Sequence, residues 1–98
     1  MNGAEYIASF LEKKNCKNVF LVTGGACAFI VDAIARNPNL KYYPMQHEQS
    51  AAMAADALWK IDRTIGVTVA TSGPGATNLI TGIACSFFDS IPTIHLTG

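Results

Sequence analysis

The sequence contains few charged residues and no excess of either sign. Only 14% of its 98 residues are Asp, Glu, Lys or Arg, and seven basic side chains balance seven acidic ones. Globular proteins carry about 25% charged residues, and nucleic-acid-binding domains usually show a basic patch. The balance therefore predicts no nucleic-acid partner. Half of the chain is hydrophobic, which excludes a disordered or collagen-like protein.

Cysteine pairs, metal-ligand spacings and long apolar runs are also absent. Cys16, Cys27 and Cys85 form no Cys-x-x-Cys motif, and three cysteines cannot all pair within one chain. His47 and His95 lie too far apart in the sequence to add a ligand motif, so we predict no metal site. No apolar run reaches the ~18–20 residues of a membrane span, and the polar start shows no secretory signal. These absences predict a protein of the reducing cytoplasm with no membrane partner.

Helical and strand patterns alternate strictly along the chain. Strands are predicted at 19–23, 40–44, 65–70 and 92–96, and helices near 7–14, 29–34, 48–61 and 75–88. Such alternation predicts parallel strands joined by right-handed crossovers, with helices on both faces of the sheet. We therefore predict an α/β fold: a three-layer, doubly wound, mostly parallel sheet of flavodoxin-like topology. Because the sequence stops just after a strand, we expect the sheet to be truncated at the C-terminus.

The helices predicted at 48–61 and 75–88 contain mostly small or apolar residues. From Ser50 onward, only Ser50, Asp56 and Lys60 are plainly polar in the first of them. A helix that is apolar around most of its circumference must be buried on more than one side. A chain of this size has too little mass to cover both faces of its sheet. We therefore predict that these helices form a subunit or domain interface.

A glycine-rich turn, Ser72-Gly73-Pro74-Gly75-Ala76-Thr77-Asn78, follows one predicted strand and opens the next helix. Free backbone N–H groups and the positive end of a helix dipole gather at such a turn, so it can receive an anion or a polar cofactor edge. It matches neither Gly-x-Gly-x-x-Gly, because position 78 is Asn, nor a P-loop, because no Gly-Lys-Ser/Thr follows. Ser72 also lacks the preceding glycine of a nucleophile elbow. By itself, the turn is either a tight corner or a ligand cradle.

Glu48 stands at the first turn of a predicted helix, at the edge of the sheet where open α/β folds bind ligands. The helix dipole alone would favour an isolated acidic residue there. The alanines and Met53 that follow suggest instead that the carboxylate lies in an apolar pocket. A carboxyl group held in such a pocket has a raised pKa and can exchange protons near neutrality.

Several motifs together carry a resemblance to a known family. They are His47-Glu48-Gln49 before a small-residue helix, Ala70-Thr71-Ser72-Gly73-Pro74-Gly75-Ala76-Thr77-Asn78, Asp89-Ser90-Ile91-Pro92, Gly24-Gly25 and Leu96-Thr97-Gly98. In this order they resemble the N-terminal pyrimidine-binding domain of thiamine diphosphate enzymes. The similarity is to the acetolactate synthase and pyruvate oxidase group in particular, and it covers nearly the whole chain.

The resemblance implies a cofactor, a substrate class and a set of site residues. The cofactor would be thiamine diphosphate, and the substrate pyruvate or another 2-oxo acid, in a transferase or lyase reaction. The family's glutamate that matches Glu48 hydrogen-bonds the aminopyrimidine ring and favours the imino tautomer that takes the thiazolium proton, so Glu48 is the implied catalytic residue. The implied cofactor-binding residues are Gly24, Gly25, Glu48, Thr71, Gly73, Pro74, Gly75 and Asn78, with Met53 and Pro74 as candidate apolar walls.

The resemblance also implies that part of the site lies elsewhere. Family members hold the diphosphate and Mg²⁺ through a Gly-Asp-Gly segment of a separate domain, and no Gly-Asp-Gly occurs here. We therefore expect residues 1–98 to be an incomplete pyrimidine-binding domain. It would work in a homodimer or homotetramer, or with a diphosphate-binding domain on another chain, and FAD use by the parent enzyme stays open. The alternative hypothesis is a non-catalytic remnant of this domain that serves as an oligomerisation or regulatory module.

Overall fold

Four helices and four strands alternate along the chain in the computed structural model, which describes all 98 residues. They are α1 (Gly3–Lys13), β1 (Asn18–Leu21), α2 (Ala28–Arg36), β2 (Lys41–Pro44), α3 (Glu48–Asp62), β3 (Val67–Ala70), α4 (Pro74–Phe88) and β4 (Ile94–Thr97). The predicted order of elements is thus confirmed. None of the four helices combines the length and the apolar content that a bilayer crossing requires.

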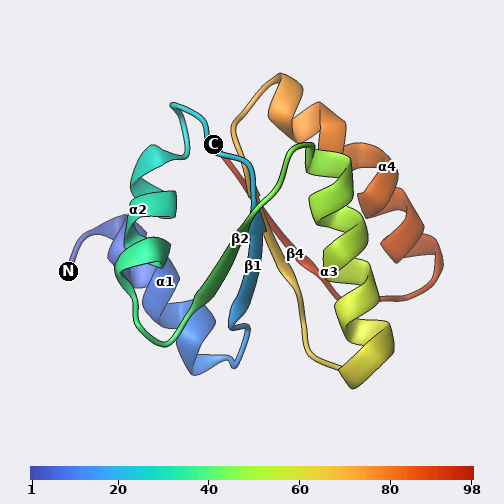
Figure 1. Cartoon of the computed structure of the whole chain (residues 1–98), viewed down its shortest axis with the longest axis horizontal. Coiled ribbons are helices and arrows are strands. Elements are labelled where there is room, and N and C mark those ends of the chain that lie inside the picture. The colour runs from blue at the N-terminus through green and yellow to red at the C-terminus, as the bar shows by residue number, and fades with distance from the viewer.

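The strands form one parallel sheet in the order β2-β1-β3-β4. Helices α1 and α2 lie on one side of this sheet, and α3 and α4 lie on the other (Figure 1). The predicted three-layer, doubly wound α/β fold is therefore confirmed. The chain passes from β1 outward to β2, returns across the sheet to β3, and then runs outward in the opposite direction to β4.

The two faces of the sheet are packed with side chains of different size. Towards α1 and α2, Val19 and Leu21 of β1 join Val67 and Val69 of β3 in the larger apolar core. Towards α3 and α4, the buried apolar cluster is small and consists of Ala52, Ala70 and Leu79. Alternate residues of a strand point to opposite faces, so β3 contributes to both cores and is buried along its whole length.

Although helices lie on both faces of the sheet, all four residues of β2 are exposed. β2 lies at the edge of the sheet, next to β1 alone. Its aromatic residues still contribute, because Tyr43 stacks on Phe20 with 5.1 Å between ring centroids.

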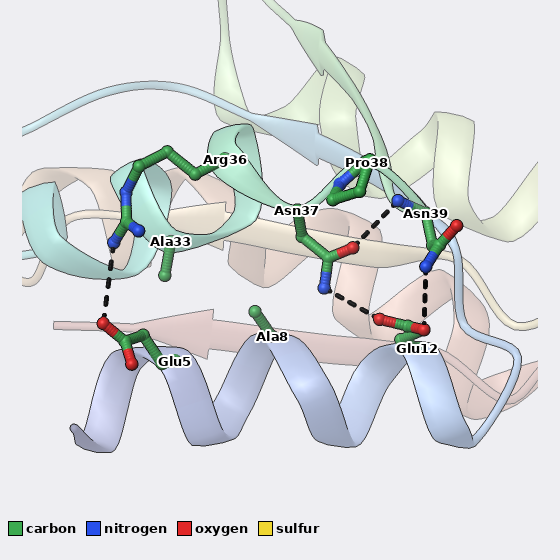
Figure 2. Close-up of a pocket in the computed structure, with 8 residues that line it drawn as sticks. All are labelled: Glu5, Ala8, Glu12, Ala33, Arg36, Asn37, Pro38 and Asn39. Carbon is green, nitrogen blue, oxygen red and sulfur yellow. Dashed lines mark hydrogen bonds and ion pairs between the residues drawn. The ribbon is translucent and has the colours of Figure 1, made fainter. Parts of the chain in front are cut away.

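A polar pocket of about 230 Å³ lies between α1 and the segment that joins α2 to β2 (Figure 2). The carboxylate of Glu12 accepts hydrogen bonds from the side-chain amides of Asn37 (2.9 Å) and Asn39 (3.0 Å). Arg36 lies 3.9 Å from Glu5 at the other end of the pocket. These contacts tie α1 to α2, and they lie at the amino end of β2, away from the carboxyl ends of the strands.

His95 of β4 is half-buried between two hydroxyl groups. Its Nδ1 lies 2.6 Å from Oγ1 of Thr68, and its Nε2 lies 2.9 Å from Oγ1 of Thr93. Burial lowers the pKa of this imidazole from its ordinary value, because the charged form loses hydration. The folded chain therefore favours neutral His95.

We expect the free energy of unfolding to decrease as the pH falls from about 7 to about 5.5. An unfolded histidine has a pKa of about 6.5, so below this pH the unfolded chain binds protons that the folded chain does not. Stability present above about pH 6.5 is then lost as the pH approaches the lower pKa of folded His95. Urea titrations at both pH values would measure the change, and His95→Gln should remove most of it. An equal pH dependence in both proteins would contradict the assignment.

Candidate functional site

The order of the strands reverses between the two central strands, β1 and β3. β1 leads outward to β2, whereas β3 leads outward to β4 on the other side. Open α/β sheets bind ligands at such a reversal of strand order. The loop that contains Gly24 and Gly25 follows β1, and the turn from Thr71 to Gly73 follows β3. Both predicted loops thus meet at the same edge of the sheet.

Gly24 lies directly against Thr71 across this reversal point. A methyl group on Gly24 would lie 2.5 Å from Cβ of Thr71, closer than real side chains approach one another. Gly25, in contrast, has no atom within 4 Å of the position of such a methyl group. Gly24 therefore packs against Thr71, whereas Gly25 is exposed to solvent.

The turn before α4 has the backbone that its sequence predicts. Gly73 is the N-cap residue and has φ 75°, a conformation that favours glycine. Pro74 occupies the first position of the helix, where a missing N–H costs nothing. The next residue, Gly75, is buried, and the Thr77 hydroxyl donates to the Pro74 carbonyl oxygen at 3.1 Å. This geometry directs the first turn of α4 towards the start of α3.

Glu48 is the first residue of α3 and is half-buried. His47 caps the helix, since its Nδ1 accepts the backbone N–H of Gln49 at 3.0 Å. Oε1 of Glu48 accepts a hydrogen bond from the side-chain amide of Asn78 on α4, at 3.1 Å. The environment is thus less apolar than the residues after Glu48 suggested, because α4 supplies a polar partner.

Gly75 is buried and packs closely beside this carboxylate. A methyl group at Gly75 would lie 2.9 Å from Cγ2 of Thr71 and 3.4 Å from Oε2 of Glu48. Glu48, Asn78, Gly75, Thr71 and Gly24 therefore form one cluster, which we call the switch-point cluster. Three elements position it: the loop after β1, the start of α3, and the turn into α4.

Other candidate residues lie outside the switch-point cluster. Met53 is 38% exposed on α3, so it forms no closed wall beside Glu48. None of the three cavities in the structure is lined by residues of the cluster, which is an open edge. No group of three or more His, Cys, Asp or Glu side chains could hold a metal ion.

Sequence reasoning missed a buried polar contact between α3 and α4, which Asp56 and Ser86 form. Asp56 is 6% exposed, and its Oδ2 accepts a hydrogen bond from the hydroxyl of Ser86 at 2.8 Å. The available signal was a lone carboxylate in an alanine-rich helix, two turns after Glu48 and on the same face.

Comparison with known proteins identifies the family. Residues 1–98 match the family described as thiamine pyrophosphate enzyme, N-terminal TPP binding domain. The chain belongs to this family. The resemblance inferred from the glutamate and glycine motifs is therefore confirmed over the whole chain.

The relatives of this thiamine pyrophosphate enzyme domain include large subunits of acetolactate synthase. It is 46% identical to the acetolactate synthase large subunit of Cyanidium caldarium over 98% of the chain, and 47% identical to the probable large subunit of Methanocaldococcus jannaschii over all of it. It is also 43% identical to the isozyme 2 large subunit of Escherichia coli over all of the chain. The chain spans 16–18% of the length of these relatives.

The contrast between the two neighbouring glycines is testable. We expect Gly24→Ala to lower the free energy of unfolding by about 1–3 kcal/mol, because its methyl group would overlap Thr71. Gly25→Ala has space and an ordinary backbone conformation, so it should leave this free energy unchanged or raise it by up to about 1 kcal/mol. Urea unfolding of both variants measures the difference. Equal losses would mean that the two loops do not meet as described.

Proposed function

We propose that this chain forms the pyrimidine-binding side of a thiamine diphosphate site in an acetolactate synthase-like enzyme that acts on pyruvate or another 2-oxo acid. One observation carries the proposal: Glu48 presents a half-buried carboxylate at the reversal of strand order, where Asn78 donates to its Oε1 and Gly75 lies against its Oε2. Family membership and the names of the relatives support it.

The switch-point cluster fits a flat, aminated heterocycle. A methyl group at Gly75 would lie 3.4 Å from Oε2 of Glu48, so glycine keeps side-chain atoms of α4 away from this oxygen. A carboxylate can accept a hydrogen bond from a protonated ring nitrogen or donate one when protonated. The cluster contains no cationic side chain that could bind a diphosphate. We propose that the diphosphate and Mg²⁺ are held by residues outside this chain, in another domain or on another subunit.

We propose a role for each residue of the cluster. When bound, the cofactor supplies the reactive carbon and the electron sink for a 2-oxo acid, and the protein supplies orientation and electrostatics. Glu48 would exchange a proton with the ring at its carboxylate. The amide of Asn78 donates to Oε1, which holds the carboxylate in place and leaves Oε2 free to face the ring. Gly24, Gly73 and Gly75 would let backbone approach the ring closely, with Thr71 and Pro74 beside it.

The outer surfaces of α3 and α4 support a proposed subunit interface. Large apolar side chains are exposed there: Met53, Ile61, Ile80, Ile83, Phe87 and Phe88. Soluble monomers rarely expose so extended an apolar patch. We propose that this face meets another subunit in a homodimer or homotetramer, or a diphosphate-binding domain on another chain. A non-catalytic oligomerisation module would use the same face, and activity measurements on Glu48 variants distinguish the two functions.

We expect Glu48→Gln in the full-length enzyme to slow hydrogen–deuterium exchange at the thiazolium C2 of bound thiamine diphosphate by orders of magnitude. Glutamine keeps the shape of the side chain but cannot transfer a proton. Quenched-exchange NMR of the cofactor measures the rate.

Gln49→Ala is the matched control, because Gln49 is the exposed neighbour of Glu48 on α3 and its side chain lies outside the cluster. It should leave the exchange rate within about twofold of the unmodified enzyme, a difference of only ~0.4 kcal/mol. Unchanged exchange in Glu48→Gln would overturn the proposed role and favour the non-catalytic module.

The proposed interface predicts self-association of the 98-residue chain at micromolar concentration. Replacing Phe87 and Phe88 with serine should weaken association, because these side chains are 77% and 81% exposed on α4. Phe29→Ser is the control, since Phe29 is 82% exposed on α2, on the other side of the sheet. Sedimentation velocity over a concentration series measures the effect. A monomer at all concentrations, or an equal effect of Phe29→Ser, would place the interface elsewhere.

A further inference from the structure

Helices α3 and α4 pack side by side with a constant offset of sequence position. Glu48 contacts Asn78, and eight residues later Asp56 contacts Ser86; each pair is 30 residues apart. Midway between them, Ala52 contacts Gly82 with the same offset. The two helices are therefore parallel, and one contact recurs every four residues, or about every 6 Å along the axis.

The middle contact brings the helices close without fixing their register. A methyl group on Gly82 would overlap Cβ of Ala52, so the glycine is needed for this approach. Side chains as small as these form shallow ridges, and ridges packed into grooves are what resists sliding between helices. The Ala–Gly contact thus sets the distance between α3 and α4 but only weakly opposes a shift along their axes.

The contact at Asp56 has the properties needed to fix the register. Its Oδ2 accepts the Ser86 hydroxyl, and its Oδ1 lies 2.8 Å from Nζ of Lys60, which is also 3.7 Å from Asp89. The hydrogen bond with Lys60 lowers the pKa of Asp56 below its ordinary value; the Ser86 hydroxyl acts in the same direction, against the effect of burial. Asp56 is therefore a carboxylate at neutral pH. A shift of the helices would separate this buried charge from Ser86, which is costly.

We propose that Asp56 is a positioning residue for Glu48 and acts through Ser86 and the register of α3 against α4. The proposal rests on the proposed role of Glu48. The Glu48–Asn78 hydrogen bond is exposed, so water competes for both groups. The buried Asp56–Ser86 bond lies two helical turns behind it. A slip of one residue moves a helix by about 1.5 Å, enough to separate Asn78 from the carboxylate.

The first test measures the register in the chain without cofactor. Ser86→Ala removes the hydroxyl, and Asp56 keeps Lys60 as a partner, so the buried charge is not left alone. We expect the NMR cross-peak between the Glu48 side-chain methylenes and the Asn78 side-chain amide to lose at least about half of its intensity, as it would when a population of similar size leaves the register. Thr81→Ala, at an exposed position of α4, is the matched control and should leave the cross-peak unchanged. Urea unfolding of each variant shows whether the fold is retained.

The second test measures the consequence in the full-length enzyme with thiamine diphosphate and Mg²⁺. We expect Ser86→Ala to slow C2 exchange by about 10- to 100-fold, because a displacement near 1 Å can cost about 100-fold. Asp56→Asn keeps an oxygen that can accept the Ser86 hydroxyl, so it should retain most of the exchange rate, whereas Asp56→Ala should not. The affinity for the cofactor should change much less than the rate.

The results separate this inference from the proposed function. If Glu48→Gln abolishes exchange while Ser86→Ala and Asp56→Ala leave both the cross-peak and the exchange rate intact, Asp56 has no positioning role. If Glu48→Gln has no effect, the function assigned to Glu48 fails, and the cross-peak still reports whether Asp56 controls the register. A cross-peak lost equally in Thr81→Ala would also overturn the inference.

Discussion

The position of Glu48 depends on how closely α3 can approach its neighbours. A methyl group on Gly66 would lie 2.6 Å from Cα of Ala55, and one on Gly82 would overlap Ala52. α3 is therefore held against the segment before β3 on one side and against α4 on the other, by contacts that only glycine and alanine permit. Interiors are packed densely enough that an added methylene is felt. A larger side chain at these points would move the start of α3 away from the reversal of strand order.

The larger apolar core and most of the proposed site lie in different halves of the domain. Large aliphatic residues such as Leu11, Leu21 and Ile34 fill the core between the sheet and the first two helices. The core under α3 and α4 is smaller and built from Ala52, Ala70 and Leu79. The hydrophobic effect scales with the apolar area removed from water, so the first core contributes more to folding. In the half that contains α3 and α4, less apolar surface is buried, but the small residues allow the backbones to approach closely. This close approach brings Glu48, Gly75 and Asn78 together.

Much of the fold could be predicted from the sequence because each element carries its own local signal. Turn residues such as Gly24-Gly25 and Gly73 separate the elements, and right-handed crossovers then limit the order of the strands. The exposure of β2 could not be predicted, because it depends on the place of the strand in the sheet. Tyr42 and Tyr43 fit a buried strand equally well.

The sequence predicts which residues belong to the candidate site better than it predicts which of them contact one another. Glu48 and the run from Gly73 to Asn78 stand out in the sequence because each opens a helix just after a strand and belongs to the motifs that carry the family resemblance. The hydrogen bond between Glu48 and Asn78 could not be predicted, since the two residues are 30 positions apart and meet only through the register of two helices. That register depends on contacts between distant positions of α3 and α4, such as Asp56 with Ser86, which no local pattern encodes.

The exposed face of α4 and the register of α3 against α4 are physically connected. Ser86, which holds Asp56, is followed directly by Phe87 and Phe88, whose side chains are exposed. A helix that is buried on one side only can tilt or slide more easily than one that is packed on both, because fewer contacts oppose the motion. A partner that covers Phe87 and Phe88 would therefore restrain the same turn of α4 that carries Ser86. Because the contacts of Ser86 with Asp56 and of Asn78 with Glu48 depend on the same register of α3 against α4, that restraint would also hold Asn78 beside Glu48. The proposed interface and the proposed site would then be stabilised together.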